Sequence, residues 1–277
     1  MSYTTIMPEG PEIKYLREYL LHTILGKYLI GIEEYSKPLK DIETFKKIIE
    51  VGSKGKNLWI RTESQYLLIH LGLTGWLSEI KNPNTVKYVI SFAENQNQNQ
   101  NQTQGILSVS LNDSRKLSLI KPMTNIEFES YINKLGPDIF TKQFTLDHLK
   151  NICHNKNVGI CGILTKQELV SGIGNYIKSE VLYISRINPY KKGKELSDPI
   201  IETLYKTILH VAFSCYYEYM TERHYPIPPE VAKLCPDNIQ VPYLIKVYKR
   251  KFDDFNNVVR NDIIYGRATF WAEELQQ

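Results

Sequence analysis

A chain of 277 residues, 42% of them hydrophobic, is long enough for about two domains and too apolar to be wholly disordered. No run approaches the roughly 20 apolar residues that cross a bilayer, and the N-terminus lacks the layout of a secretory signal. The 34 Lys and Arg residues exceed the 30 Asp and Glu residues, which permits nucleic-acid binding without requiring it. Four scattered cysteines with no Cys-x-x-Cys pair exclude a disulfide scaffold and a zinc ribbon. We expect a soluble protein of a reducing, intracellular compartment, with no membrane partner.

The first half of the chain begins with a predicted helix and continues as short strands. Apolar residues recur at helical spacing after Pro11, which predicts a helix at about 11–25. Runs rich in Val, Ile, Leu and Tyr predict strands of a sandwich or barrel at 28–34, 58–62, 66–72, 87–93 and 106–111. The segment 95–104 is an Asn/Gln tract without apolar residues, which we interpret as a disordered loop of a hairpin.

The second half of the chain is predicted to be mainly helical. The pattern changes near 135–138, and helices are expected at 146–153, 159–166, 175–187 and 199–220. The proline-rich segment 225–229 interrupts this pattern. Two β-like runs, 244–248 and 268–271, joined by a polar loop, end the chain.

Pro8 is the first residue with unusual chemical potential. A proline at a free N-terminus is a secondary amine that can attack a carbonyl-like carbon and form an iminium ion. The positive end of the predicted helix would lower the pKa of that amine and leave more of it unprotonated. Glu9 and Glu12 lie nearby in the chain and could move protons. The plainer alternative is that both glutamates only stabilise the helix start.

Several polar segments could contact nucleic acid, although each is more often structural when taken singly. Lys56 precedes a predicted strand, and Leu73 lies in a glycine-rich loop, where it could be a core residue or a wedge that unstacks bases. Arg115 lies in a turn. The sequence Gly-Ile-Gly-Asn at 172–175 opens a predicted helix, whose free N–H groups favour a phosphate. Basic residues also surround the predicted C-terminal hairpin.

Together these segments resemble the formamidopyrimidine-DNA glycosylase/endonuclease VIII family of base-excision-repair enzymes. The resemblance rests on motifs that follow one another in the family's order: Pro-Glu-Gly-Pro-Glu, a Gly-Lys before a strand, His-Leu-Gly-Leu-Thr-Gly, an Asp-x-Arg turn, Leu-Gly-Pro, Gly-Ile-Gly-Asn and Gly-Arg-Ala-Thr-Phe. It implies an α+β protein with an N-terminal helix on a two-layer antiparallel β-sandwich, then a helix-two-turns-helix domain with a C-terminal β-hairpin finger. We expect the catalytic sandwich at 8–134, a linker at 135–142, the helical domain at 143–242 and the finger at 243–277.

The resemblance also assigns catalytic roles. Pro8 corresponds to the family's nucleophile, Glu9 to its proton-shuttling glutamate and Glu12 to the second glutamate of the opening motif. Lys56 corresponds to the lysine that binds phosphate beside the lesion. The implied activity is that of a bifunctional DNA glycosylase and abasic-site lyase, which removes an oxidised base and cleaves the strand through a Schiff base.

Other positions match the family's DNA-binding residues. Leu73, Arg115 and Leu117 correspond to the residues that fill the gap left by the flipped nucleotide, although the family usually has an aromatic wedge where Leu117 stands. Gly174, Asn175 and Arg267 match the family's phosphate clamps. The chain lacks the four cysteines that commonly bind zinc in the finger, and Ala272 and Leu275 occupy the last two ligand positions. It therefore resembles the zincless endonuclease VIII-like branch, and no metal or other cofactor is expected.

Two alternatives and one processing step complete these expectations. The chain could be a non-catalytic protein that binds damaged DNA through the same fold, or a small-molecule enzyme with an N-terminal proline, which the phosphate-binding motifs disfavour. We expect damaged DNA as the partner, a monomer, and a mild preference for oxidised pyrimidines and hydantoins. Because residues 1–7 would bury the Pro8 nitrogen in an amide, we expect the functional polypeptide to begin at Pro8 after translation from Met7.

Overall fold

The computed structural model describes residues 7–95 and 105–276. The expected disordered loop at 95–104 and the extension before Met7 lie outside these residues, Asn95 excepted. The chain divides into two compact units: unit 1 is Met1–Pro8 and Ile13–Lys134, and unit 2 is Glu9–Glu12 and Leu135–Gln277. Within the described ranges, no helix has both the length and the apolar character needed to cross a bilayer.

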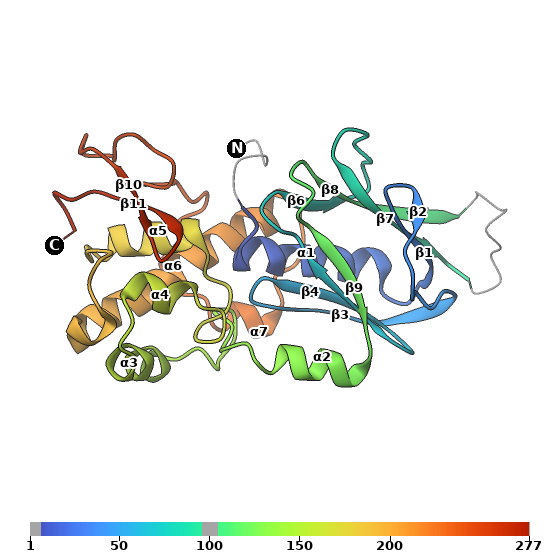
Figure 1. Ribbon diagram of the computed structural model, residues 1–277, viewed down its shortest axis with the longest axis horizontal. Coiled ribbons are helices and arrows are strands. Elements are labelled where there is room, and N and C mark those ends of the chain that lie inside the picture. Colours follow the sequence, from blue (N-terminus) through green and yellow to red (C-terminus); the bar gives the residue numbers. More distant parts are fainter. Residues whose placement is uncertain (1–6, 96–104, 277) are drawn as a thin grey trace. The chain divides into compact units, whose positions relative to one another are not determined.

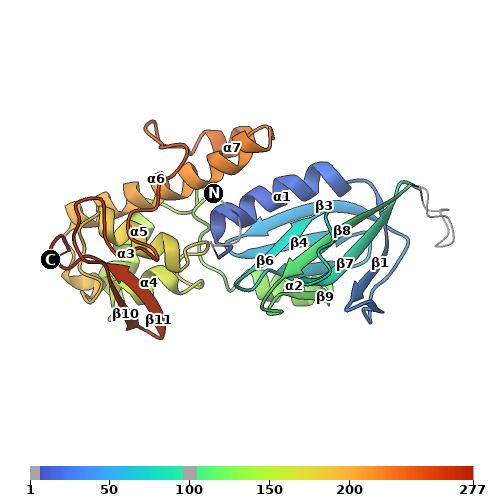
Figure 2. The ribbon, with the colours of Figure 1, turned by 90° about the horizontal axis from the view of Figure 1, so that it is seen from above.

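Unit 1 is a two-layer antiparallel sandwich (Figures 1 and 2). One layer has the order β6-β8-β7-β1, with the short β2 beside β1, and the other has the order β3-β4-β5-β9. The layers join where the start of β1 pairs with the start of β3. The strands are β1 (Tyr28–Glu34), β2 (Lys37–Pro38), β3 (Lys46–Lys54), β4 (Asn57–Thr62), β5 (Tyr66–His70), β6 (Gly75–Ser78), β7 (Val86–Ala93), β8 (Ile106–Asp113) and β9 (Leu119–Met123).

The helix α1 (Gly10–Ile24) lies along one side of this sandwich (Figure 2). Leu16 and Leu20 are completely buried, as their helical spacing predicts. The ring of Tyr15 stacks on Trp76 of β6, and the Arg17 side chain donates to the Val51 carbonyl of β3. The predicted helix and the two-layer antiparallel architecture are therefore confirmed.

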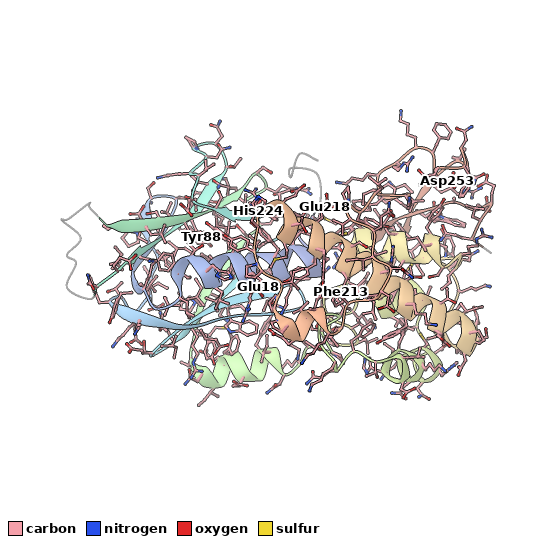
Figure 3. All side chains as sticks on the ribbon, turned by 180° about the vertical axis from the view of Figure 1, so that it is seen from behind. Glu18, Tyr88, Phe213, Glu218, His224 and Asp253 are labelled. Atoms are coloured by element: carbon pink, nitrogen blue, oxygen red, sulfur yellow. The ribbon has the colours of Figure 1, made fainter. Side chains whose placement is uncertain are left out.

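Four strands and one helix of unit 1 were not predicted, namely β2, β3, β6, β9 and α2 (Asn125–Ile132). In β3, lysines and a glycine interrupt the apolar pattern. Gly52 of that strand lies directly under the ring of Trp59, where a Cβ atom would come within 2.2 Å of the indole. Tyr88 of β7 is buried in the core of this unit (Figure 3).

Unit 2 contains the predicted helices and a two-stranded hairpin. Its elements are α3 (Leu146–Asn155), α4 (Ile160–Thr165), α5 (Asn175–Ile184), η1 (Gly193–Glu195), α6 (Asp198–Glu222), α7 (Pro229–Ala232), β10 (Arg260–Ile264) and β11 (Arg267–Trp271). Phe213 of α6 is completely buried and packs against Phe140 (Figure 3). The helix α5 ends three residues earlier than predicted, and Arg186 follows it in the left-handed conformation.

The prediction of a strand at 244–248 is wrong. The backbone of this segment instead wraps around the carboxylate of Glu180, a fully buried residue of α5. The N–H groups of Lys246, Val247 and Tyr248 donate to that carboxylate at 2.7–2.9 Å, and the Tyr243 hydroxyl donates to it at 2.7 Å. Because three successive N–H groups converge on one side chain, they are not available for a β-ladder. The hairpin is instead formed by β10 and β11.

Candidate active site

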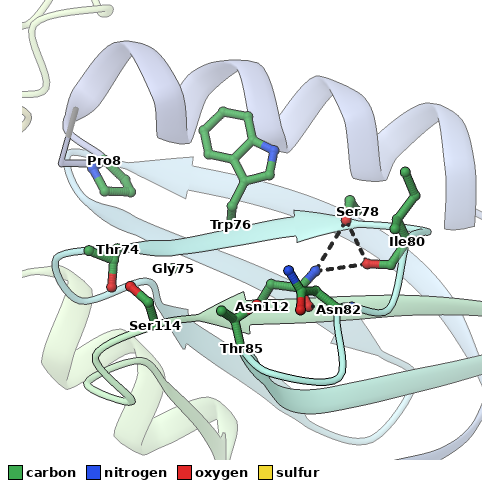
Figure 4. Close-up of a pocket in the computed structure, with 10 residues that line it drawn as sticks. All are labelled: Pro8, Thr74, Gly75, Trp76, Ser78, Ile80, Asn82, Thr85, Asn112 and Ser114. Atoms are coloured by element: carbon green, nitrogen blue, oxygen red, sulfur yellow. Dashed lines mark hydrogen bonds between the residues drawn. The ribbon is translucent and has the colours of Figure 1, made fainter. Parts of the chain in front are cut away.

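Pro8 lies at the entrance to α1 and lines a pocket of about 360 Å³ in unit 1 (Figure 4). The other lining residues come from β6, the end of β8 and the intervening loops: Thr74, Gly75, Trp76, Ser78, Ile80, Asn82, Thr85, Asn112 and Ser114. The sequence predicted the chemistry of Pro8 but not this pocket, because the other lining residues, from Thr74 to Ser114, are far from Pro8 in the chain.

Lys56 lies in the tight turn between β3 and β4, where Gly55 has the positive φ of 59° that the turn requires. His70 lies at the end of β5, and its Nδ1 accepts the Gly72 N–H at 3.1 Å. Burial, followed by the nearby positive charge of Lys56, lowers the pKa of His70. The neutral ring therefore keeps its proton on Nε2, which makes His70 a hydrogen-bond donor near Lys56 that the sequence reading missed.

Two loops of unit 1 are joined by hydrogen bonds. Leu73 lies on the first loop, and Arg115 and Leu117 lie on the second. The Thr74 hydroxyl donates to the Asp113 carboxylate, and the Arg115 N–H donates to both groups. Burial alone would raise the pKa of Asp113, but the hydrogen bonds that it accepts outweigh burial and lower that pKa. Leu117 is 53% exposed, and Arg115 is also exposed. These loops thus present an apolar and a cationic side chain from a fixed base.

Glu9 is buried at the N-terminus of α5 in unit 2. Its carboxylate accepts the N–H groups of Gly174 at 2.7 Å, Tyr176 at 2.9 Å and Ile177 at 3.2 Å. The positive end of the helix stabilises this anion. The Gly174 N–H, which the sequence suggested for a phosphate, is therefore satisfied by Glu9 instead.

Glu12 is buried beside Glu9, and one of its carboxylate oxygens accepts the Glu9 N–H at 2.9 Å. The Tyr176 hydroxyl donates to Glu12 at 3.1 Å. Burial raises the pKa of Glu12 to about 8, and the charge of Glu9 acts in the same direction. Glu12 is therefore neutral at pH 7 while Glu9 is bound as an anion, so the two glutamates of the opening motif have different chemical states.

Asn175 and the strand β11 are linked by a buried lysine that the sequence analysis did not select. The Lys178 ammonium donates to the Asn175 side chain at 3.3 Å, to the Ala268 carbonyl at 3.2 Å and to the Thr269 hydroxyl at 2.8 Å. Lys178 follows Asn175 by about one helical turn, and this spacing could have indicated from the sequence that the two side chains meet. Arg267 itself is exposed at the start of β11.

Tyr248 is a second residue of unit 2 that the sequence analysis missed. It is buried against Tyr176 and Phe270. Burial, followed by the charge of Glu9, raises the pKa of Tyr248 to about 12, which places a neutral hydroxyl near the Glu9 carboxylate. In the sequence, Tyr248 ends the apolar run 244–248 and precedes basic residues, so this segment was predicted to be a strand and not part of the active site.

Comparisons with known proteins identify the family and the fold of the chain. Residues 7–120 match the N-terminal domain of formamidopyrimidine-DNA glycosylase, and residues 135–214 match the H2TH domain of that enzyme. The chain is 30% identical to the formamidopyrimidine-DNA glycosylases of Rickettsia conorii and of Arabidopsis thaliana. Both alignments include 74% of this chain, with 76% of the bacterial protein and 57% of the plant protein. The fold matches that of the Lactococcus lactis enzyme bound to DNA with an abasic site, with a TM-score of 0.75, 19% identity, and coverage of 98% of this chain and 100% of the other.

Proposed function

Because the chain belongs to the formamidopyrimidine-DNA glycosylase family, we propose that it removes damaged bases from DNA and cleaves the resulting abasic strand through Pro8. The observation that carries this proposal is the opening motif itself. Pro8 lines a pocket large enough for a small ring system, and the next residue, Glu9, has a carboxylate fixed by three N–H groups. A nucleophilic amine and an adjacent proton carrier are the groups that this chemistry needs.

The chemistry proceeds in two stages. The Pro8 nitrogen attacks C1′ of the damaged nucleotide, the bond from C1′ to the base breaks, and the base leaves with the bonding electron pair and takes up a proton. The C1′–O4′ bond of the sugar then breaks, O4′ takes up a proton, and the nitrogen, which has lost its own proton, forms the C1′=N bond of an iminium ion. This ion acidifies the C2′–H bond, so loss of that proton expels the 3′-phosphate and cuts the strand. Glu9 moves protons in these steps, while neutral Glu12 supports the Glu9 backbone without adding a second negative charge.

DNA is held through its phosphates and through the gap left by the everted nucleotide. Lys56 and the neutral His70 supply donors in unit 1, and Asn175 and Arg267 supply donors in unit 2. Such contacts fix the register of the duplex and carry no sequence information. Leu73, Arg115 and Leu117 would occupy the vacated position in the stack.

The chain belongs, in our proposal, to the branch whose finger lacks zinc. Ala272 is buried with Tyr183 and Val247, and Leu275 packs against this cluster, so apolar contacts occupy the positions of the last two zinc ligands. The Asp253 carboxylate organises the loop before the hairpin by accepting the Phe255 and Asn257 N–H groups and the Tyr183 hydroxyl. No group of three potential metal ligands occurs among the residues that the structure describes.

Trapping with borohydride on duplex DNA that contains an abasic site tests the proposal. Borohydride reduces the iminium ion, so a Schiff-base enzyme becomes covalently attached to the DNA. Protein that begins at Pro8 should be trapped, with the adduct located on Pro8 by peptide mass spectrometry. The matched control is the 277-residue chain, in which the Pro8 nitrogen is an amide and should not react. Equal trapping of both proteins, or an adduct on Lys56, would contradict the assignment of Pro8.

A further inference from the structure

We propose that Lys87 of β7 is a positioning residue that fixes Leu117 for insertion into damaged DNA. This inference rests on the proposed function, in which Leu117 helps to fill the gap left by the everted nucleotide. It identifies the group of unit 1 that holds Leu117 in place. The observation that carries it is that the Lys87 ammonium donates to the backbone carbonyls on both sides of Leu117.

Leu117 needs such support because of where it lies. The segment 114–118 is the loop that connects β8 to β9, and these two strands belong to opposite layers of the sandwich. Lys116, the residue before Leu117, has the left-handed backbone conformation with a φ of 57°, which a residue with a side chain keeps only when its surroundings hold it there. The Leu117 side chain is 53% exposed, so its own packing does little to fix it.

Lys87 reaches this loop from a β-bulge. The pairing of β7 with β8 shifts its register between Val86 and Tyr88, so Lys87 is the extra residue, and a bulge turns the side chain at that position in a new direction. The Lys87 Nζ donates to the Lys116 carbonyl at 3.1 Å and to the Ser118 carbonyl at 2.6 Å. The lysine side chain is only 11% exposed, and hydrogen bonds from a charged donor are stronger than those between neutral groups.

The neighbouring charges leave the two carbonyls as the main partners of Lys87. The Glu34 carboxylate lies 3.6 Å from the Lys87 Nζ, which is farther than either carbonyl. In the opposite direction, the Lys116 Nζ donates to the Val86 carbonyl at 2.8 Å. The bulge and the loop therefore hold each other through two lysine side chains.

The loop that carries Leu73 lies against the same backbone. Gly72 has a φ of 64°, and a Cβ atom at this position would lie 2.9 Å from the Leu117 carbonyl carbon and 3.0 Å from the Leu117 Cβ. The two loops are thus in direct contact next to Leu117. A clamp on the backbone around Leu117 therefore also supports the loop from which Leu73 extends.

The test compares affinities for two duplexes that differ at one nucleotide. One is undamaged, and the other contains a tetrahydrofuran abasic analogue, which leaves a gap in the stack and does not react with Pro8. Binding to the undamaged duplex depends mainly on phosphate contacts, so the ratio of the two affinities isolates the filling of the gap. This ratio is measured for protein that begins at Pro8, for its Lys87→Met and Leu117→Ala variants, and for the double variant. The matched control is Lys27→Met, which removes another lysine contact of unit 1, the ion pair with Glu94.

For Lys87→Met we expect the ratio to fall about tenfold, which is the effect of losing a hydrogen bond from a charged group. Leu117→Ala should also lower the ratio, and Lys87→Met should lower it no further in that background, because the lysine acts through Leu117. Lys27→Met should leave the ratio unchanged. An equal loss of affinity for both duplexes, or a further fall of the ratio in the Leu117→Ala background, would overturn the proposal.

The behaviour of the wild type separates this proposal from the proposed function. A wild type that borohydride traps on abasic DNA, but that does not prefer the duplex with the analogue, would overturn the role of Lys87 alone. A wild type that is not trapped and shows no preference would refute the proposed function, and the role of Lys87 with it.

A second variant covers the case in which Lys87→Met does not fold, which its melting curve will show. Lys87→Gln keeps an amide donor but removes the charge. Its ratio should fall less than that of Lys87→Met, and again no further in the Leu117→Ala background. A folded Lys87→Gln protein with the wild-type ratio and a folded Lys87→Met protein with the same ratio would each show that Leu117 does not depend on Lys87.

Discussion

The substitution Glu12→Gln should make the protein more stable at alkaline pH than the wild type. Glu12 is buried, accepts the Glu9 N–H through one oxygen and contacts the Tyr176 hydroxyl. Gln has the same shape as a protonated Glu and can keep both contacts, with its carbonyl accepting from Glu9 and its amide donating to the Tyr176 oxygen. The variant therefore reproduces the neutral side chain at every pH.

The magnitude follows from the pKa of Glu12, which burial raises from 4.5 to about 8. The folded state retains a proton that the unfolded state releases above pH 4.5, so the wild type loses stability as the pH rises from 4.5 to 8 and then levels off. Each pH unit in that window corresponds to about 1.4 kcal/mol, which sets an upper bound of about 5 kcal/mol. Gln does not titrate, so this loss is absent from the variant.

Urea denaturation of both proteins at pH 5, 6.5 and 8 measures this difference. The free energy of unfolding of Glu12→Gln should gain on that of the wild type by at least about 2 kcal/mol between pH 5 and 8, allowing for relaxation around the charge. The exposed Glu168 provides the control, and Glu168→Gln should follow the wild type at all three values. Parallel profiles for Glu12→Gln and the wild type would show that Glu12 is already charged in the folded protein.

Three further predictions address Glu9, Arg267 and the finger. Glu9→Gln should suppress base excision far more than DNA binding. It should also lower the free energy of unfolding by about 1 kcal/mol, because the new amide group would face an N–H group at the start of α5. Excision near the wild-type rate would show that Glu9 is only a structural residue. Arg267→Ala should weaken binding to abasic DNA and reduce the steepness of the plot of log affinity against log salt concentration by about 0.9. A lower melting temperature with unchanged affinity would instead assign Arg267 a structural role. Treatment with EDTA should leave borohydride trapping unchanged, and stoichiometric zinc lost together with activity would disprove a zincless finger.

The parts of the fold that the sequence predicted are those with a regular local pattern. The apolar spacing after Pro11 identified α1, and alternating or continuous apolar runs identified five strands of unit 1. The strand β3 was missed because Gly52 and three lysines interrupt its pattern, and the reason for Gly52 lies in a neighbouring strand, whose Trp59 ring needs the space. A partner distant in the chain cannot be inferred from the local pattern.

The same limit explains what was missed at the site. The motif order identified Pro8 and Glu9, but Glu9 binds N–H groups 165 to 168 residues further along the chain. The run 244–248 has the composition of a strand, yet the single buried carboxylate of Glu180 gathers its N–H groups. A buried charge that is satisfied by backbone groups overrides local β-propensity, because leaving it unpaired would cost more than a few strand hydrogen bonds gain.

These contacts make α5 the element on which the chemistry of unit 2 depends. Its N-terminus binds the carboxylate of Glu9, Lys178 in its second turn holds the strand that begins with Arg267, and Glu180 anchors the segment before the finger. The proton carrier and the exposed arginine are thus fixed to one short helix of ten residues. A substitution that loosens the finger, such as Lys178→Met, should therefore weaken DNA binding and also slow base excision at saturating DNA. Weaker binding with an unchanged excision rate would instead confine Lys178 to the support of the finger.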